Sequence, residues 1–222
     1  MKMRCWLPLL VVGLLGGCAI NGGDRPVATT FDFGLPTAAI VAAMPNKPAW
    51  GDVRLAIEVT APSWFDALGV DYRLAYDNPL KQREYVGSRW AGSPGVLLSQ
   101  RLAQRLGLPE AAGGVASDCL LRFELQEFSQ VFDTPQVSRG VLLGRANLID
   151  VRHQPLLAVP MQIERAATTP DAAGGVRALV EATDELGQRL AVWLGELNTN
   201  GTLARCRPVS APPAGTKGAA RQ

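Results

Sequence analysis

The sequence predicts an α+β fold, a single domain in which two long helices pack on one face of a mainly antiparallel sheet. Apolar residues recur at three- and four-residue steps in two long segments, residues 94–106 and 171–197, as on the buried side of an amphipathic helix. Much of the remaining chain alternates apolar and polar residues, the pattern of strands with one buried face. The order of these elements is that of an α+β domain.

The N-terminal half of this domain is predicted to be rich in strands. Residues 53–59 place four aliphatic side chains on one face, with Arg54 and Glu58 on the other. Prolines interrupt residues 36–52, which are therefore expected to form a loop. The predicted elements are a strand, this loop, a strand, a corner or turn of helix, and two further strands, at residues 29–35, 36–52, 53–59, 61–69, 70–75 and 82–86.

The two helices carry local signals at their ends. Ser93 can cap the helix at residues 94–106, and Pro94 suits its first position, where a missing N–H costs no hydrogen bond. Gly107 is expected to end it. The second helix, residues 171–197, is followed by a polar, glycine-containing segment that breaks it.

Three consecutive strands are predicted to form an antiparallel meander between the helices. They cover residues 118–132, 138–151 and 156–165. In the first of them the apolar phase changes near Glu127, which indicates a bulge or a twist.

The N-terminus has the layout of a lipoprotein signal. Lys2 and Arg4 precede an uncharged apolar run at residues 6–15, and Leu15-Gly16-Gly17-Cys18 matches a lipoprotein cleavage box. Cleavage between Gly17 and Cys18 would leave Cys18 carrying acyl chains such as palmitate, whose combined burial gives stable anchoring. An ordinary signal peptide with a chance cysteine is the alternative.

The segments around the domain follow from this signal. Residues 1–17 are the predicted signal peptide, residues 18–28 a lipidated tether, residues 29–207 the domain and residues 208–222 a disordered tail. Ala19, rather than Asp, follows the cysteine, as in lipoproteins released to the outer membrane of a bacterium with two membranes. The expected location is therefore the periplasmic face of that membrane.

Charge and cysteine content restrict the partners. The chain has 22 basic and 20 acidic residues, and cleavage removes Lys2 and Arg4 to leave 20 of each. Without a basic stripe, nucleic acid is not an expected partner. Once Cys5 has left with the signal and Cys18 is acylated, Cys119 and Cys206 remain as an even pair in an oxidising compartment, which predicts a disulfide over two unconnected thiols.

No catalytic, metal or cofactor site is expected. His153 is the single histidine, in a turn beside a proline, and no cysteine or histidine cluster accompanies it as a zinc site would require. Glu124 and Glu127 lie three residues apart on a predicted strand and should face opposite sides, which disfavours a carboxylate pair. The chain is therefore expected not to be an enzyme.

Aromatic residues near a loop are the candidates for partner or lipid contact. Tyr72, Tyr85 and Trp90 are named for this role, because aromatic side chains beside a loop can form a binding edge. Packing in the core or at its rim is the alternative for them.

Four segments in order resemble the ABC-type transport auxiliary lipoproteins, a family that includes the lipoprotein partner of the paraquat-inducible, mammalian-cell-entry (MCE) transport system. They are residues 72–76, 85–94, 121–132 and 146–150, and the likeness spans residues 29–197 except residues 36–52. The resemblance implies a non-enzymatic outer-membrane lipoprotein that works with an MCE-domain protein and inner-membrane ABC or permease components to move phospholipids or related apolar molecules between membranes. A lipid-carrying binding module and a structural lipoprotein of another envelope assembly complex remain alternatives.

Overall fold

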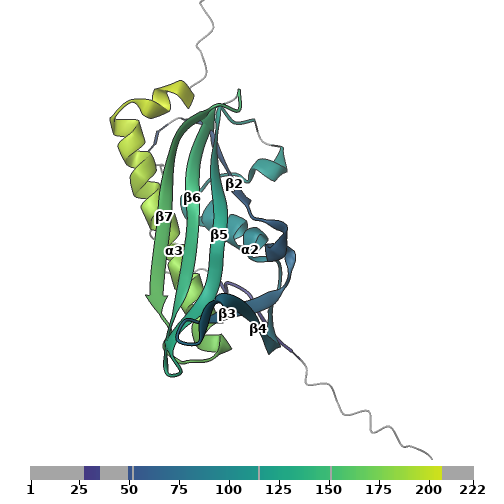
Figure 1. The fold of residues 1–222 in the computed structure, drawn as a ribbon. Helices are drawn as coiled ribbons and strands as arrows, with labels where there is room; N and C mark the ends of the chain where they lie inside the picture. The colour runs from purple at the N-terminus through teal and green to yellow at the C-terminus, as the bar shows by residue number, and fades with distance from the viewer. Residues whose placement is uncertain (1–27, 36–49, 52, 115, 151, 207–222) are drawn as a thin grey trace, which may run out of the picture.

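The computed structural model describes residues 28–35, 50–51, 53–114, 116–150 and 152–206 (Figure 1). The predicted signal peptide, Cys18, most of the tether, most of the loop at residues 36–52 and the predicted tail lie outside the described residues.

The described strands form one seven-stranded mixed sheet. Its order is β1-β4-β3-β5-β6-β7, and β2 also pairs with β5. Three pairings are parallel (β1–β4, β2–β5 and β3–β5) and three are antiparallel. The strands are β1 (Thr29–Phe31), β2 (Leu55–Thr60), β3 (Gly69–Leu74), β4 (Asn78–Trp90), β5 (Cys119–Thr134), β6 (Val137–Asp150) and β7 (Pro155–Ala166).

The expectation of a mainly antiparallel sheet was therefore wrong. The physical reason is the length of β5, whose 16 residues offer one edge to β6 and the other to two shorter strands. On that second edge, β2 pairs in parallel with the first part of β5, from Leu55 beside Cys119, and β3 pairs in parallel with its last part, at Tyr72 beside Gln130. Period-two alternation identifies strands but does not choose their partners.

The predicted meander of β5, β6 and β7 is confirmed, and so is the bulge in β5. The register of β5 on β6 shifts between Leu125 and Glu127, so Gln126 is the extra residue. The long strands of the meander lie side by side in Figure 1.

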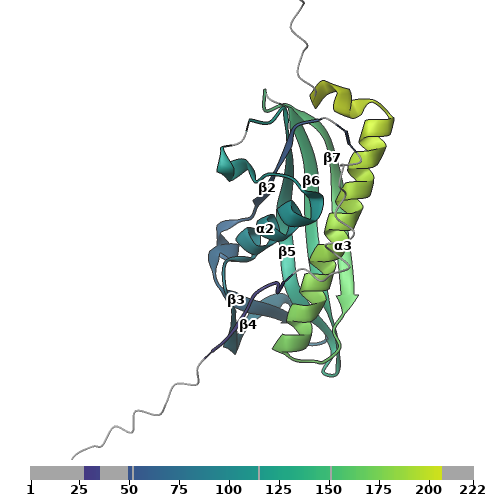
Figure 2. The ribbon, with the colours of Figure 1, turned by 180° about the vertical axis from the view of Figure 1, so that it is seen from behind.

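Both helices lie in front of the sheet when the molecule is seen from behind (Figure 2). They are α2 (Pro94–Leu106) and α3 (Ala172–Thr199). Pro94 is the first residue of α2 and Gly107 ends it with a φ of 64°, as predicted, although the Ser93 side chain makes no capping hydrogen bond. At α3 the Asp171 carboxylate accepts the N–H of Gly174 at 2.8 Å.

The core lies between the helices and the helix-facing side of the sheet. Side chains there, such as Leu121, Phe123, Leu142 and Leu179, are fully buried. Gly140 of β6 sits against α3 so closely that a Cβ there would stand 2.8 Å from backbone atoms of Ala178 and Leu179. The helix is therefore positioned by backbone contact as well as by side-chain packing.

The helices are joined to each other by an ion pair. Arg101 of α2 donates from Nε and Nη2 to the two carboxylate oxygens of Asp184 of α3, at 2.8 and 2.9 Å. The Arg101 side chain is 5% exposed and that of Asp184 19%. A two-pronged contact of this kind fixes both the distance and the orientation of the two side chains.

The predicted disulfide is present between Cys119 and Cys206, whose Cα atoms are 5.2 Å apart. Cys119 begins β5, and Cys206 ends η3 (Thr202–Cys206), a short 3-10 helix after α3. The bridge therefore ties the end of the described chain to the start of the central strand.

Candidate functional site

Tyr72 and Tyr85, two of the three predicted contact residues, lie on neighbouring strands. The ring centroids of Tyr72 on β3 and Tyr85 on β4 are 4.5 Å apart, and Phe132 stands edge-on to Tyr72 at 6.0 Å. The Tyr85 hydroxyl donates to Oε1 of Gln130 at 2.8 Å. Both tyrosines are half-buried, so their rings form a rim at the end of the core rather than a free surface.

Burial fixes the protonation of Tyr85. Desolvation, followed by the neighbouring Tyr72 and Asp171, raises the pKa of the Tyr85 hydroxyl above its ordinary value. The hydroxyl therefore stays protonated and serves as a hydrogen-bond donor to Gln130. Gln130 is itself buried and donates from Nε2 to the Ser138 hydroxyl at 2.8 Å.

Trp90, the third candidate contact residue, belongs to the core. It is 1% exposed, and its ring packs against Phe33 at 5.6 Å and Phe128 at 5.7 Å between centroids. The structure thus places Trp90 in the core, because its side chain faces inward on β4 while that of the preceding residue, Arg89, is exposed.

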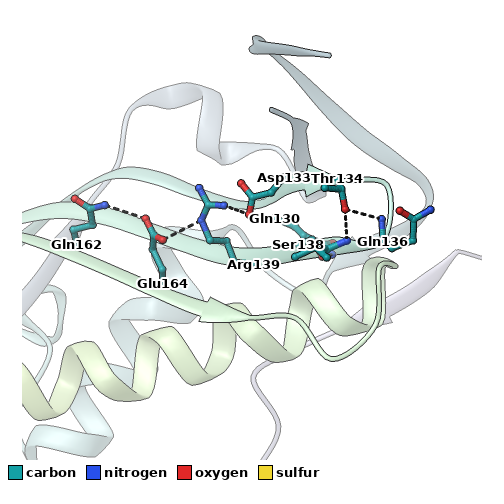
Figure 3. A network of polar contacts seen from close by, with 9 residues as sticks. Gln130, Asp133, Thr134, Gln136, Ser138, Arg139, Gln162 and Glu164 are labelled. Carbon is teal, nitrogen blue, oxygen red and sulfur yellow. Dashed lines mark hydrogen bonds and ion pairs between the residues drawn. The ribbon is translucent and has the colours of Figure 1, made fainter. Parts of the chain in front are cut away.

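A polar network closes the end of the sheet where β5 turns into β6 (Figure 3). Arg139 is paired with Asp133, and its Nε lies 3.0 Å from Oε2 of Glu164 on β7. The hydrogen bond with Asp133 raises the pKa of the Arg139 guanidinium. Gln162 supports Glu164 with a hydrogen bond of 3.0 Å. These contacts cross three strands and serve the architecture of the sheet.

The sheet face away from the helices carries both Glu124 and Glu127. The prediction that these two carboxylates face opposite sides of the strand was wrong. Glu124 pairs with Arg145 and Glu127 with Leu143, two positions apart on β6, so both glutamates lie on the same face. The extra residue Gln126 in the bulge reverses the alternation between them.

This carboxylate face is tied down by cross-strand contacts. Arg73 Nη2 stands 3.0 Å from Oε2 of Glu127, and Gln82 Nε2 donates to Asp71 at 2.6 Å. Burial, with Glu84 and Glu127 nearby, raises the pKa of Asp71 to about 6 against the opposing effect of Gln82. Among the described residues, no group of histidine, cysteine and carboxylate side chains is arranged to hold a metal ion.

His153 lies in the turn between β6 and β7. It is exposed and has a φ of 59°, the left-handed region that a tight turn can require. Its position agrees with a solvated turn residue.

The unpaired edge of β4 exposes two large apolar side chains. Strand β1 pairs with β4 only at residues 88–90, so residues 78–87 face no other described strand on that side. Leu80 and Val86 on this edge are 90% and 102% exposed. Unpaired edges with exposed apolar side chains are common places for another chain to dock. We call residues 78–87 the β4 edge.

A second candidate surface is a cleft of about 580 Å³ beside the short strand β2. Its walls come from the end of β2, the 3-10 helices η1 (Ser63–Asp66) and η2 (Ala111–Gly113), and the first turns of α2. We call it the β2-edge cleft. No sequence signal indicated it, because its walls come from three separate stretches of the chain, within residues 57–66, 93–99 and 110–112.

The described helices include none with the length and apolar content needed to cross a membrane.

Comparisons with known proteins show similarity in fold. No protein-family model matches the chain, and no curated protein matches it. A crystal structure of a Xanthomonas campestris protein, described as a DUF330 protein, is similar at a TM-score of 0.61 and 17% identity, over 78% of this chain and 99% of that one. An uncharacterized protein is similar at a TM-score of 0.56 and 16% identity, over 76% and 99% of the two chains.

A third similar structure, from Caulobacter crescentus CB15, is named as a proposed lipoprotein. It has a TM-score of 0.41 and 13% identity, over 69% of this chain and 93% of that one. The first two similarities show that the fold of this chain recurs in other proteins.

Proposed function

We propose that this chain is a lipid-anchored, non-enzymatic auxiliary component of an MCE/ABC-type intermembrane lipid transport system, and that it docks the MCE-domain protein at the outer membrane. The sequence resemblance suggests the system, and Leu15-Gly16-Gly17-Cys18 suggests the anchor. The fold shared with the Xanthomonas campestris DUF330 protein is compatible with this role and does not identify it.

The main support for the docking role is the β4 edge. It presents strand backbone without a strand partner, together with the nearly fully exposed Leu80 and Val86, which lie where the pairing of β4 with β3 is irregular. At Leu80 the N–H already donates to Oδ1 of Asn78 at 3.0 Å, so the backbone groups open to a partner are those of the other edge residues. A partner strand or loop placed there would satisfy the backbone groups and bury both side chains, which provides affinity without any change in the core.

The position of β1 supports an anchor close to this edge. Residues 18–27 precede the described chain, and ten residues span at most about 35 Å. Because β1 pairs directly with the end of β4, from Thr29 beside Ser88, an acylated Cys18 would hold the part of the β4 edge next to β1 within roughly that distance of the bilayer. The membrane anchor and the docking edge would then act together.

The lipid-carrying alternative gains no supporting observation. It requires an apolar cavity between sheet and helices, where the described side chains, including Phe123, Leu142 and Leu186, are fully buried in one hydrophobic cluster. Native mass spectrometry of the delipidated protein tests it, because a co-purified lipid would favour carriage over docking.

Site-specific photo-crosslinking in cells tests the docking role. A benzophenone amino acid at Val86 or Leu80 should capture the MCE-domain protein. The same probe at Val192, a 61% exposed position on α3, is the matched control and should not. Absence of the MCE-domain protein from the Val86 and Leu80 products would count against the proposal, and capture of a different envelope protein would favour the structural-lipoprotein alternative.

A Cys18→Ala substitution tests the anchor. The variant should fold, because Cys18 precedes the domain, but it should move from the membrane fraction to the soluble fraction and fail to support transport. Membrane partition unchanged from that of the native protein would refute acylation at Cys18.

A further inference from the structure

The β2-edge cleft presents unpaired strand backbone. The Ile57 N–H points away from β5 and donates to the Pro109 carbonyl at 2.9 Å, so the outer edge of β2 is already used at that residue. Peptide groups two residues apart in a strand point in the same direction. The N–H and C=O of Val59 therefore point into the cleft, where no described segment takes the place that Pro109 takes beside Ile57.

The cleft is acidic. Three carboxylates line it, and among the described residues that line it none is basic. Glu58 is neutralised by Arg122 on the neighbouring strand, with Nε 2.7 Å from Oε2. Glu110 accepts a hydrogen bond from the Ser99 hydroxyl at 2.9 Å, which orients the carboxylate without neutralising it, and Asp66 is exposed. The cleft thus keeps two uncompensated negative charges.

Apolar side chains complete the cleft. Phe65 and Ala61 line it, and so does Val96 of α2, which is 51% exposed. A volume of about 580 Å³ is within the range of natural binding clefts, and it is bounded by strand backbone on one side and by a helix on another. An extended peptide uses such a surface fully, because its backbone can pair with the strand while alternate side chains enter the cleft.

We propose that the β2-edge cleft binds an extended segment of a partner protein that carries a lysine or arginine. The segment pairs with Val59 and places its cationic side chain between Asp66 and Glu110. The inference rests on the proposed function only in requiring a protein partner. It does not depend on that partner being an MCE-domain protein.

Photo-crosslinking in the full-length, lipidated protein tests this site separately from the β4 edge. The benzophenone amino acid is placed at Val96 or Ala112, both exposed and lining the cleft, and the peptides joined to it are sequenced by mass spectrometry. The expected product is a segment of another protein with a basic residue close to the crosslink. Neutralising the cleft with Asp66→Asn and Glu110→Gln should lower the yield about tenfold, equivalent to about 1.4 kcal/mol.

Glu196→Gln is the matched control, since Glu196 is an exposed carboxylate on α3 outside the cleft, and it should leave the yield unchanged. The proposal is overturned by no crosslink from Val96 and Ala112, by a crosslink to residues 207–222 or to a second copy of the chain, by a captured segment without a basic residue, or by no effect of neutralisation. Capture of a basic segment from a protein other than an MCE-domain protein would support this site while counting against the proposed transport system.

Discussion

The ion pair between the two helices should contribute far more to stability than a comparable pair on the surface. In Asp184→Asn, the side-chain volume is kept but Arg101 loses its charged partner while it remains 5% exposed. Arg105 Nη1, 3.6 Å from the same carboxylate, loses part of its compensation too. Removing one member of a buried pair costs about 3–5 kcal/mol, because the remaining charge is left in a poorly solvated position.

Solvent reaches Asp184, which is 19% exposed, so we expect the lower end of that range, about 3 kcal/mol. The matched control is Asp118→Asn. Asp118 also makes a two-pronged contact with an arginine, at 2.6 and 2.7 Å, but Arg54 is 54% exposed. The Arg54 hydrogen bond lowers the pKa of Asp118, which is itself 14% exposed. The two pairs therefore differ in the arginine that is left behind: Arg54 stays solvated after the substitution, so Asp118→Asn should cost much less than Asp184→Asn.

Urea unfolding of the non-reduced protein at pH 7, followed by far-UV circular dichroism, measures both free energies of unfolding. Replacing the buried pair with Arg101→Met and Asp184→Leu together should recover most of the loss, because neither charge then remains buried. If Asp184→Asn and Asp118→Asn lower the free energy of unfolding equally, the argument from burial is refuted.

Three further predictions concern the disulfide, the contact between sheet and helix, and pH. Opening the Cys119–Cys206 bridge with Cys119→Ser and Cys206→Ser should lower the free energy of unfolding by up to ~4.5 kcal/mol, because the bridge closes a loop across a sequence separation of 87 residues; an unchanged urea midpoint would contradict this. Gly140→Ala should cost about 1–3 kcal/mol by forcing α3 away from β6, whereas Gly113→Ala, with open space around the new Cβ, should cost much less; equal thermal midpoints would show that α3 does not rest on Gly140. The raised pKa of Asp71 means that the native protein loses stability as pH rises through about 6, so Asp71→Asn should be about 1–2 kcal/mol more stable than the native protein at pH 8 and no more stable at pH 4; a gain independent of pH would refute the assignment.

Signals that act within a few residues were sufficient to predict much of the secondary structure. The first helix begins at Pro94 and ends before Gly107 because a proline fits the first helical position and a glycine accepts the left-handed conformation after the last. The meander of β5, β6 and β7 joins strands that are consecutive in the chain, so its antiparallel pairing needs only short turns. The Cys119–Cys206 bridge followed from the even number of cysteines left after export, without any knowledge of distance.

Choices between distant segments were decided only in three dimensions. Alternation in residues 53–59 predicts a strand, but nothing within that strand selects a parallel partner more than 60 residues away. The bulge at Gln126 was foreseen, yet its consequence, that Glu124 and Glu127 share a face, emerges only when β5 is aligned with β6. The side chain of Trp90 was also placed only by the tertiary structure. The sequence allows an aromatic residue near a loop to point outward or inward, and in the folded chain, where β4 pairs with β1, Trp90 is buried.

The candidate sites divide in the same way. The lipoprotein box at Cys18 is predicted from the sequence alone, because a processing signal is read from consecutive residues in an extended chain. The β4 edge and the β2-edge cleft were decided by tertiary structure. Each consists of strand backbone left unpaired after the rest of the sheet has formed, and whether a backbone group is paired depends on which other segments reach it.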